Sequence, residues 1–285
     1  MTSTTPEDDW TLIIRPTRRW YDLRLGELWS ARDLILLFVW RDFVSYYKQT
    51  ILGPLWYLIQ PILTTLVFTI IFGRIAGLST DELPPFLFYM AGTVIWSYFS
   101  SCLTKTADTF VGNAGLFGKV YFPRLAVPVS ILISSLIAFG IQFGLFVGFV
   151  IFYLIIGAPV QPNQAILLTP LLVLMMAGFG LGFGIIISSL TTRYRDMRYL
   201  VTFGVQLWMY ATPVIYPISA VPPKLQPLIM ANPLTPIVEI FRYAYLGGGT
   251  VSYWNLLYSF CFMVTVLLIG LVMFNRVEAT FMDTV

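Results

Sequence analysis

The chain has 285 residues, of which 58% are hydrophobic and 11% are charged, and its formal net charge is +3. Soluble domains are roughly 45–50% apolar and about 25% charged, so this composition excludes a soluble globular protein and predicts an all-α integral membrane protein. The sequence contains no histidine, which excludes imidazole as a catalytic base or a metal ligand.

The chain begins with a polar stretch that differs from everything after it. Residues 1–24 start with MTSTTPEDDW and contain no apolar run of the kind found in a signal peptide,. We therefore expect no cleaved signal and assign them as a cytoplasmic N-terminal segment. Residues 25–285 are expected to form a single membrane domain.

Residues 25–50 are predicted to form an amphipathic helix at the cytoplasmic membrane surface. At helical spacing one face collects polar side chains, namely Glu27, Ser30, Arg41, Ser45 and Lys48,. The basic side chains on that face would favour anionic lipid headgroups. Residues 34–40 are apolar all round, so a short re-entrant helix is the alternative.

Six membrane spans are expected in the rest of the chain. A helix needs about 20 predominantly apolar residues to cross the hydrocarbon core. The stretches that meet this requirement without any Asp, Glu, Lys or Arg are Leu55–Gly73, Phe86–Thr104, Ala126–Ile156, Ala165–Leu190, Tyr199–Pro217 and Tyr253–Phe274.

The distribution of Lys and Arg predicts the orientation of these spans. Of the 17 Lys and Arg side chains, 14 fall on the side that holds both termini. Arg74, Lys224 and Arg242 fall on the other side. Because basic residues concentrate in cytoplasmic loops, we expect both termini in the cytoplasm and residues 218–252 outside.

Glycines recur at four-residue spacing in two of the spans. The third span carries Gly140, Gly144 and Gly148, and the fourth carries the pairs 178/182 and 180/184. Such faces permit close backbone contact between membrane helices. The contact would lie either within one subunit or across a dimer.

Aromatic residues make up 16% of the chain. Interfacial anchoring in the membrane accounts for many of them, whereas others could line a path for sugar chains, whose rings pack on flat aromatic faces. The residues assigned to such a path are Trp56, Tyr57, Trp96, Tyr98, Tyr210 and Tyr216.

Motifs for chemistry on this chain are lacking. NAGLFGKV (113–120) resembles a phosphate-binding loop, but Asn113 and Val120 stand where that loop needs glycine and a hydroxyl residue,. Cys102 and Cys261 lie in apolar runs and are expected to pack rather than to form a disulfide.

Spans without charges disfavour an ion-coupled carrier. With neither a catalytic set nor a metal-ligand cluster, the chain is not expected to be an enzyme, and energy for uphill transport would come from elsewhere.

Residues 212–236, TPVIYPISAVPPKLQPLIMANPLTP, combine seven prolines with an apolar composition. A spanning helix cannot lose that many N–H donors, because the hydrocarbon core offers no water to replace them. A soluble linker would not be so apolar. The segment is therefore expected to be neither a span nor a simple linker.

Five stretches together resemble the membrane subunits of bacterial type-2 ABC exporters for polysaccharides and related lipid-linked polymers. They are RDFVSYYKQTILGPLWYLIQPILTTLVFTIIFG (41–73), NAGLFGKVYFPRLAVPVS (113–130), SSLTTRYRDMRYL (188–200), TPVIYP (212–217) and NPLTPIVEIFRYAYLG (232–247). The likeness runs from about residue 25 to residue 274. It implies a homodimer with a conduit between two six-span subunits, partnered by two separate subunits that bind ATP and magnesium. No cofactor on this chain and no nucleic-acid partner are expected.

The resemblance also implies a coupling element on the cytoplasmic side. The loop matching residues 105–125 forms a short helix that docks on the ATPase, with Phe122 as an apolar plug. The matching residues are Asn113, Gly118, Lys119, Phe122, Pro123 and Arg124.

For residues 212–236 the resemblance implies two short re-entrant helices that form an outer gate. The prolines would start or break these helices, and Glu239 and Arg242, three residues apart, would pair. A loop packed on the outer surface is the alternative. The gate residues are expected to be Pro222, Pro223, Gln226, Glu239 and Arg242.

The function implied is ATP-driven export of an undecaprenyl-linked, O-antigen-type polysaccharide across the bacterial inner membrane. Capsule and teichoic-acid polymers are the nearest alternatives. An ATP-independent carrier or channel and a lipid-modifying enzyme are alternatives of other classes, and the charge-free spans and the missing catalytic set respectively disfavour them.

Overall fold

The structure is a computed structural model that describes residues 25–48, 51–117, 122–191 and 196–281. Every regular element in these ranges is a helix. Five helical stretches are long and apolar enough to cross a membrane, namely Gly53–Ile75, Pro85–Ala107, Ala126–Ile155, Gln164–Thr191 and Tyr253–Val277. The chain is therefore an all-helical, multi-pass membrane protein, as its composition predicts.

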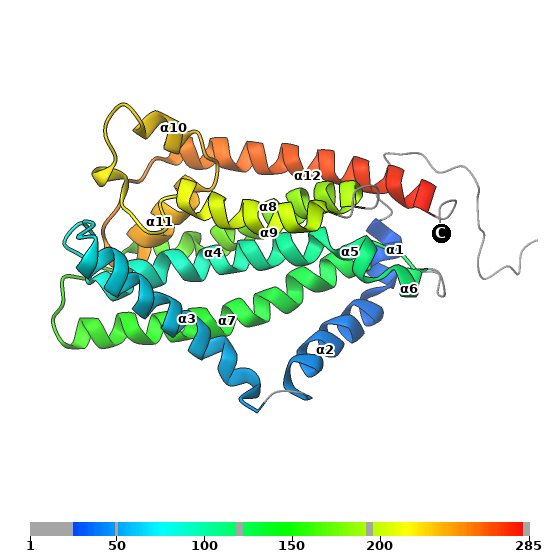
Figure 1. Ribbon diagram of the computed structural model, residues 1–285, viewed down its shortest axis with the longest axis horizontal. Coiled ribbons are helices and arrows are strands. Elements are labelled where there is room, and N and C mark those ends of the chain that lie inside the picture. Colours follow the sequence, from blue (N-terminus) through cyan, green and yellow to red (C-terminus); the bar gives the residue numbers. More distant parts are fainter. Residues whose placement is uncertain (1–24, 49–50, 118–121, 192–195, 282–285) are drawn as a thin grey trace, which may run out of the picture.

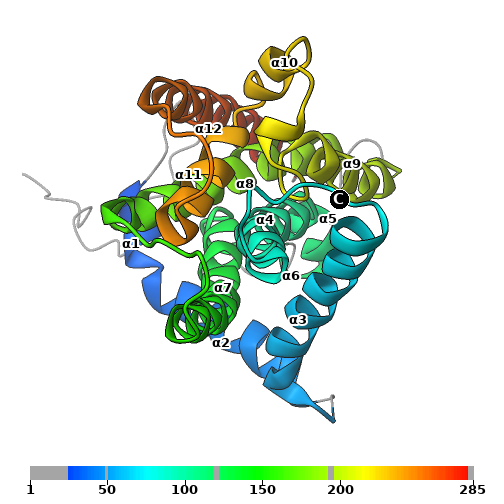
Figure 2. The same cartoon turned by 90° about the vertical axis from the view of Figure 1, so that its left-hand side faces the viewer.

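Helix α4 (Pro85–Ala107) lies at the centre of the bundle. Helices α7 (Ala126–Ile155) and α8 (Thr169–Thr191, preceded by η3, Gln164–Leu168) pack along it, and α12 (Tyr253–Phe281) packs on α8. Figure 1 shows these helices running lengthwise, and Figure 2 looks along them with α4 enclosed by its neighbours. Among the five candidate spans, α4 is the least apolar and the most buried. A helix enclosed by protein does not need a lipid-like surface, so its hydroxyl residues are tolerated.

The first candidate span lies at the edge of the bundle. It consists of η1 (Gly53–Leu55), α3 (Trp56–Phe68) and the π-helical η2 (Thr69–Ile75), and it contacts α4 and α7. Only 11% of its apolar window is buried in the chain. Most of its surface is therefore available to lipid or to another surface.

The fifth predicted span is shorter than expected. Helix α9 (Met197–Ala211) has 15 residues, which corresponds to about 22 Å at 1.5 Å per residue. The helix ends at Ala211, and Thr212 is extended with φ −107° and ψ 142°. Pro213 accounts for this, because the ring of a proline pushes the preceding residue out of the α region. The prediction of helix through Pro217 is thus wrong for its last six residues.

The glycines of α8 provide close packing inside the chain. A Cβ added to Gly180 would lie 2.5 Å from Cys102 Cβ, and one added to Gly184 would lie 2.6 Å from Thr106 Cβ. At these glycines, which have no Cβ, the backbone of α8 packs directly against α4. The glycines of α8 therefore provide contacts within one subunit rather than contacts across a dimer. The third-span glycines differ, because a Cβ added to Gly140 would meet no described atom within 4 Å.

The N-terminal region consists of α1 (Leu25–Ser30) and α2 (Arg32–Lys48), which packs on α7. The five polar residues predicted to share one face are all exposed. The buried side of α2 carries Ile35, Phe38 and Val39, whereas Leu36 and Trp40 are 60% and 65% exposed. Helix α2 thus has one apolar side that packs on α7 and a second apolar side that is exposed. Its predicted polar residues are exposed as well.

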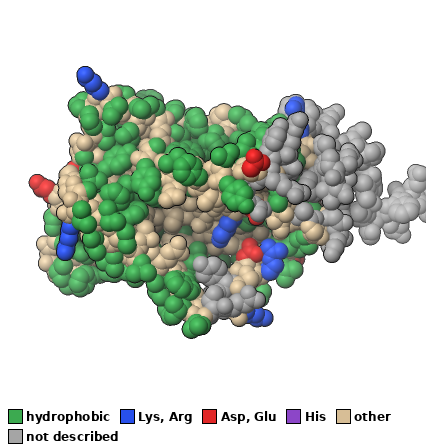
Figure 3. Space-filling model, viewed as in Figure 1, with side chains coloured by type: hydrophobic (Ala, Val, Ile, Leu, Met, Phe, Trp, Pro, Cys, Tyr) green, Lys and Arg blue, Asp and Glu red, His purple; other side chains and the backbone are tan. Residues whose placement is uncertain are grey.

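Charged side chains keep to the ends of the molecule. On the face shown in Figure 3, hydrophobic side chains cover the long flank, whereas Lys, Arg, Asp and Glu appear at the left edge and in the right-hand half. A broad apolar flank between two charged ends is typical of a protein embedded in a bilayer.

Candidate functional site

Helices α3 and α9 carry an exposed surface of neutral polar and aromatic side chains. On α9, Thr202, Gln206 and Tyr210 recur every four residues and are exposed, so they share one helix face. On α3, Trp56 and Gln60 repeat this spacing and are also exposed. Both helices contact α4, and Figure 2 shows them on the same side of the bundle. We call these five residues the α3–α9 polar face; its amides, hydroxyls and flat rings can bind molecules rich in hydroxyl groups.

Four of the six aromatic residues predicted to line a path reach the surface. Trp56 and Tyr210 are 40% and 43% exposed, and Tyr57 and Tyr216 are partly exposed. The hydroxyl of Tyr216 donates to the carbonyl of Tyr210 at 3.1 Å. This bond ties the segment after α9 to the end of that helix.

The other two aromatic residues, Trp96 and Tyr98, belong to the core. They are 5% and 3% exposed. The ring centroid of Trp96 lies 5.1 Å from that of Phe99, and the centroid of Tyr98 lies 5.2 Å from that of Phe139 on α7. In this conformation they stabilise helix packing and do not reach a cargo outside the chain.

Three residues of the α3–α9 polar face were not predicted from the sequence. Gln60, Thr202 and Gln206 had no assigned role. The available signal was the four-residue repeat of polar side chains along two apolar helices. Such a repeat places the polar residues on one face of a helix. Their exposure in the structure shows that this face is not covered by the rest of the chain.

The segment after α9 forms η4 (Ile218–Ala220), α10 (Gln226–Met230) and α11 (Thr235–Leu246) at the left end of Figure 1. Pro227 and Pro236 lie in the first turns of α10 and α11, where a missing N–H donor costs little. This confirms that prolines here start short helices. The two helices differ in burial, because α10 has no buried residue, whereas 11 of the 12 residues of α11 are buried.

The predicted gate residues in this segment differ in exposure and in hydrogen bonding. Pro222, Pro223 and Lys224 are exposed. Gln226 is partly buried, and its side-chain amide donates to the carbonyls of Val221 at 3.0 Å and of Ile218 at 3.4 Å. Gln226 therefore holds the turn together, while Lys224 is the polar side chain exposed at the tip.

Glu239 and Arg242 form the ion pair that their spacing predicts. Arg242 Nη1 lies 2.9 Å from Glu239 Oε1, and each residue is 1% exposed. Arg242 Cζ lies 3.8 Å from the ring centroid of Phe88 on α4, and Nε has no hydrogen-bond partner among the described residues. Burial raises the pKa of Glu239, and the positive charge of Arg242 opposes this shift,. The carboxylate thus depends on Arg242 to stay charged.

The ion pair also joins segments that are distant in sequence. Arg242 Nη2 donates to the carbonyls of Pro213 at 2.9 Å and of Val214 at 3.1 Å. The backbone N–H of Thr250 donates to Glu239 Oε2 at 3.2 Å. Helix α11 is therefore fixed to α4, to the residues after α9 and to the start of the last connection.

Asn232 is a further structural residue that sequence reasoning missed. Its Oδ1 accepts from Trp208 Nε1 at 3.2 Å, and its Nδ2 donates to Thr212 Oγ1 at 2.8 Å. These bonds fix the beginning of α11 to the end of α9. A polar residue between prolines in an apolar segment was the available signal.

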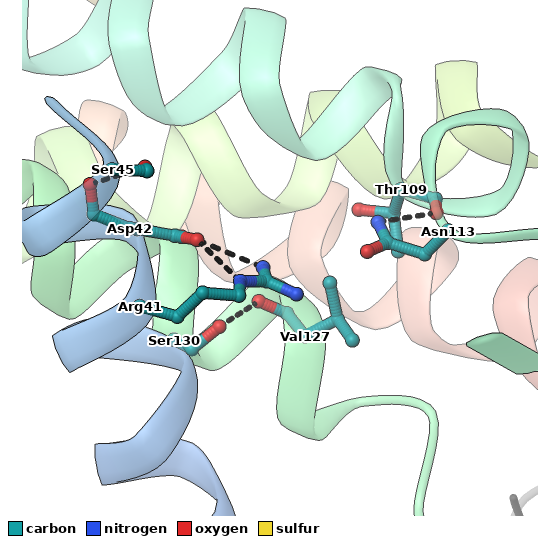
Figure 4. Close-up of polar contacts among 7 residues, drawn as sticks. All are labelled: Arg41, Asp42, Ser45, Thr109, Asn113, Val127 and Ser130. Carbon is teal, nitrogen blue, oxygen red and sulfur yellow. Dashed lines mark hydrogen bonds and ion pairs between the residues drawn. The ribbon is translucent and has the colours of Figure 1, made fainter. Parts of the chain in front are cut away.

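The predicted coupling element begins with α5 (Thr109–Gly112) and α6 (Ala114–Phe117). Asn113 joins them, because its backbone N–H and its Nδ2 both donate to the carbonyl of Thr109, at 3.2 and 3.0 Å (Figure 4). Gly118 and Lys119 lie outside the described residues. The carbonyl of Pro123 accepts a hydrogen bond from the N–H of Ala126 at 2.9 Å, which closes the turn that leads into α7.

Phe122 and Arg124 point into the chain. The ring centroid of Phe122 lies 5.7 Å from that of Phe38 on α2 and 5.6 Å from that of Phe117 on α6. Arg124 is 5% exposed, and its Cζ lies 5.5 Å from the ring centroid of Phe117. Phe122 thus joins the coupling element to the N-terminal helix, and Arg124 packs on α6 within the element. Among the described residues of this element, Val111 is an exposed large apolar side chain, at 37%.

Arg41 marks the polar side of α2 close to the same end. Its guanidinium donates two hydrogen bonds to Asp42 Oδ1, at 3.0 and 2.8 Å. Figure 4 shows Arg41 alongside the first turns of α7, where Ser130 Oγ donates to the carbonyl of Val127 at 2.8 Å. The basic group thus lies near α5 and the first turns of α7.

The described side chains form no candidate metal site. Across residues 25–281, leaving aside the undescribed gaps, no three His, Cys, Asp or Glu residues gather as metal ligands would. Both cysteines are free thiols, as predicted. Cys102 is buried, as expected for a packing residue, whereas Cys261 is exposed in this chain.

Comparisons with known proteins agree with these observations. The pattern that defines ABC-2 type transporters matches residues 33–246. The O-antigen export system permease protein RfbA of Klebsiella pneumoniae is 27% identical over 254 residues, which cover 88% of this chain and 94% of that protein. The RfbA protein of Myxococcus xanthus is 28% identical over 76% of this chain and 81% of its own length. The capsule polysaccharide export inner-membrane protein CtrC of Neisseria meningitidis is 24% identical over 86% of this chain and 91% of that protein.

Proposed function

The chain belongs to the ABC-2 type transporter family, and we propose that it exports an undecaprenyl-linked, O-antigen-type polysaccharide across the bacterial inner membrane. It is a membrane permease subunit, a transport component rather than a catalytic one. Transporters of this family act with ATP-binding subunits, which supply the energy that the sequence of this chain cannot.

The α3–α9 polar face carries the proposal; we propose that it lines the path of the polysaccharide and call it the translocation face from here on. Residues 55–73 and 199–217 contain no Asp, Glu, Lys or Arg, yet α3 and α9 expose amide, hydroxyl and aromatic groups there. Neutral hydrogen bonds and ring stacking are weak and repeatable, which suits a polymer that must slide. Two relatives named for O-antigen export and one named for capsule polysaccharide export support the same class of cargo.

We further propose that two copies of the chain enclose the path and that two ATP-binding subunits dock below them. The translocation face is open in one chain, so a closed conduit needs a second surface. Helices α5 and α6 lie at the same end as the C-terminus, opposite α10 and α11 (Figure 1). This arrangement supports cytoplasmic termini beside the ATPase, with α9 as the sixth membrane-crossing helix.

A capsule polymer is the second candidate cargo, because the CtrC protein matches nearly the whole chain. Both candidates share hydroxyl-rich repeating sugars and a lipid anchor. The translocation face offers hydrogen bonds to either, so the cargo must be identified from the cell that makes it.

Deleting this chain in its own bacterium tests the proposal. We expect the lipid-linked polysaccharide to accumulate on the cytoplasmic side and to disappear from the cell surface, with recovery when the chain is restored. Glycan analysis of the accumulated polymer identifies it as O-antigen, capsule or teichoic acid. Unchanged surface polysaccharide with no internal accumulation would contradict the proposed function.

A further inference from the structure

The outer end of the molecule contains a firmly held part and a lightly held part. The firmly held part includes α11, fixed by its buried ion pair, and the contact of Leu83 with Gly248, where an added Cβ would lie 2.7 Å from Leu83 Cδ1. The lightly held part is residues 218–230, which we call the tip segment. All of its residues are described, and only Ile218 and Val221 are buried, at 4% and 9% exposure.

A hydrogen bond joins the tip segment to the first outer loop. Ser219 Oγ donates to Asp81 Oδ1 at 2.5 Å, across 138 residues of sequence. Asp81 belongs to the connection between η2 and α4. Both side chains lie toward the surface, so water can replace this bond when it breaks. In this respect it differs from the buried pair of α11, whose groups have no access to water.

The loop that carries Asp81 has an unusual backbone. Asp81 and Glu82 have φ values of 51° and 63°, although neither is glycine. They are the two central residues of a turn that the N–H of Leu83 closes onto the carbonyl of Thr80 at 3.0 Å. Two consecutive left-handed residues without glycine are strained. Such strain persists only when surrounding contacts hold it. Within the loop, the N–H of Asp81 donates to Ser79 Oγ at 3.2 Å and Thr80 Oγ1 donates to the carbonyl of Leu83 at 2.8 Å. From outside the loop, Ser219 contacts Asp81 and Gly248 contacts Leu83.

We propose that the Asp81–Ser219 hydrogen bond is a latch that holds the tip segment closed over the outer end of the path. The tip segment moves when cargo leaves, whereas α11 stays fixed to α4. The moving part ends where Asn232 binds Thr212 and Trp208. Opening breaks the exposed Asp81–Ser219 bond, whereas the bonds from Thr235 Oγ1 to the carbonyl of Ile229 at 2.7 Å and from Asn255 Nδ2 to Met230 Sδ at 3.8 Å hold the hinge end of the tip segment. The turn at Asp81 and Glu82 then loses one of the contacts that hold it, so its strain favours release. This inference rests on the proposed function and assigns the movement to α10 alone of the two outer helices.

Two disulfide cross-links test the latch in the complete complex of permease and ATP-binding subunits. The background carries Cys102→Ala and Cys261→Ala. Asp81→Cys with Ser219→Cys locks the tip segment, and Leu83→Cys with Gly248→Cys is the matched control within the fixed part. We expect both pairs to cross-link on oxidation. Polysaccharide export should fall at least tenfold for the 81–219 pair, recover on reduction, and stay within twofold of the reduced protein for the 83–248 pair.

Each other outcome is informative. Full export with the 81–219 pair cross-linked would overturn the latch, and so would an 81–219 pair that fails to cross-link while the 83–248 pair does. Loss of export with the 83–248 pair would show that the outer end moves as one body, which also contradicts the inference. Export by the reduced proteins is measured first, because its absence in the unsubstituted complex would count against the proposed function instead.

Discussion

Replacing Arg242 by methionine is expected to lower the free energy of unfolding by about 3–5 kcal/mol, the cost of breaking a buried ion pair. Glu239 would keep its place in the interior, 1% exposed, where without Arg242 its carboxyl group must either stay charged without a partner or take up a proton, and both cost free energy. The carbonyls of Pro213 and Val214 would lose their donor as well. Denaturant unfolding of the purified subunit in detergent measures the loss.

Two further variants distinguish the effect of losing the charge pair from the effect of losing side-chain packing. Arg242→Met with Glu239→Leu removes both charges and is expected to recover most of the lost stability. Arg242→Lys keeps the charge but cannot reach Glu239 and two carbonyls at once, so it should fall between the wild type and Arg242→Met. A loss below about 1 kcal/mol for Arg242→Met, typical of an exposed pair, would show that this pair does not fix α11.

Replacing Val111 by aspartate is expected to weaken binding of the ATP-binding subunit about 30-fold, which corresponds to about 2 kcal/mol. Val111 is the exposed apolar residue of α5, at 37%, and a carboxylate there would be desolvated when the subunits dock. Titration of the purified permease with the ATP-binding subunit measures the dissociation constant.

Phe122→Ala is the matched control for this experiment. Phe122 packs on Phe38 and Phe117 inside the chain, so its truncation should lower thermal stability and change the affinity far less than Val111→Asp does. Unchanged affinity for Val111→Asp, together with a large loss for Phe122→Ala, would place the docking surface elsewhere.

The spans were predictable where an apolar stretch has clear ends. Phe86–Thr104 and Ala126–Ile156 were expected, and the helices cover Pro85–Ala107 and Ala126–Ile155. The end of α9 was harder to place, because residues 212–217 are as apolar as the helix before them. Pro213 carried the signal, since a proline disfavours helix at the residue before it.

Side-chain direction was less predictable than helix position. Lipid is as apolar as a protein core, so an aromatic residue in a span fits a lipid contact, a core or a path equally well. For this reason Trp96 and Tyr98 could not be distinguished from Trp56 and Tyr210 by sequence. Phe122 likewise suited an exposed plug, until the position of Phe38 showed that it packs inward.

At the outer end of the molecule, spacing in the sequence predicted only the contact between residues that are close together in the chain. A separation of three residues was enough to predict that Glu239 and Arg242 pair. Their burial and the carbonyl partners at residues 213 and 214 depend on segments nearly 30 positions away, which local patterns do not reveal. The contact between Asp81 and Ser219 joins residues 138 positions apart and had no counterpart in the sequence analysis.

Reconstitution tests the central claim most directly. The permease and its ATP-binding subunit are placed together in lipid vesicles with the lipid-linked polysaccharide in the outer leaflet, and protected polymer inside the vesicles is measured. The account predicts that polymer enters only with ATP and both subunits, and that the permease alone neither transports it nor hydrolyses ATP. Transport by the permease alone, or ATP hydrolysis by the pure chain, would contradict it.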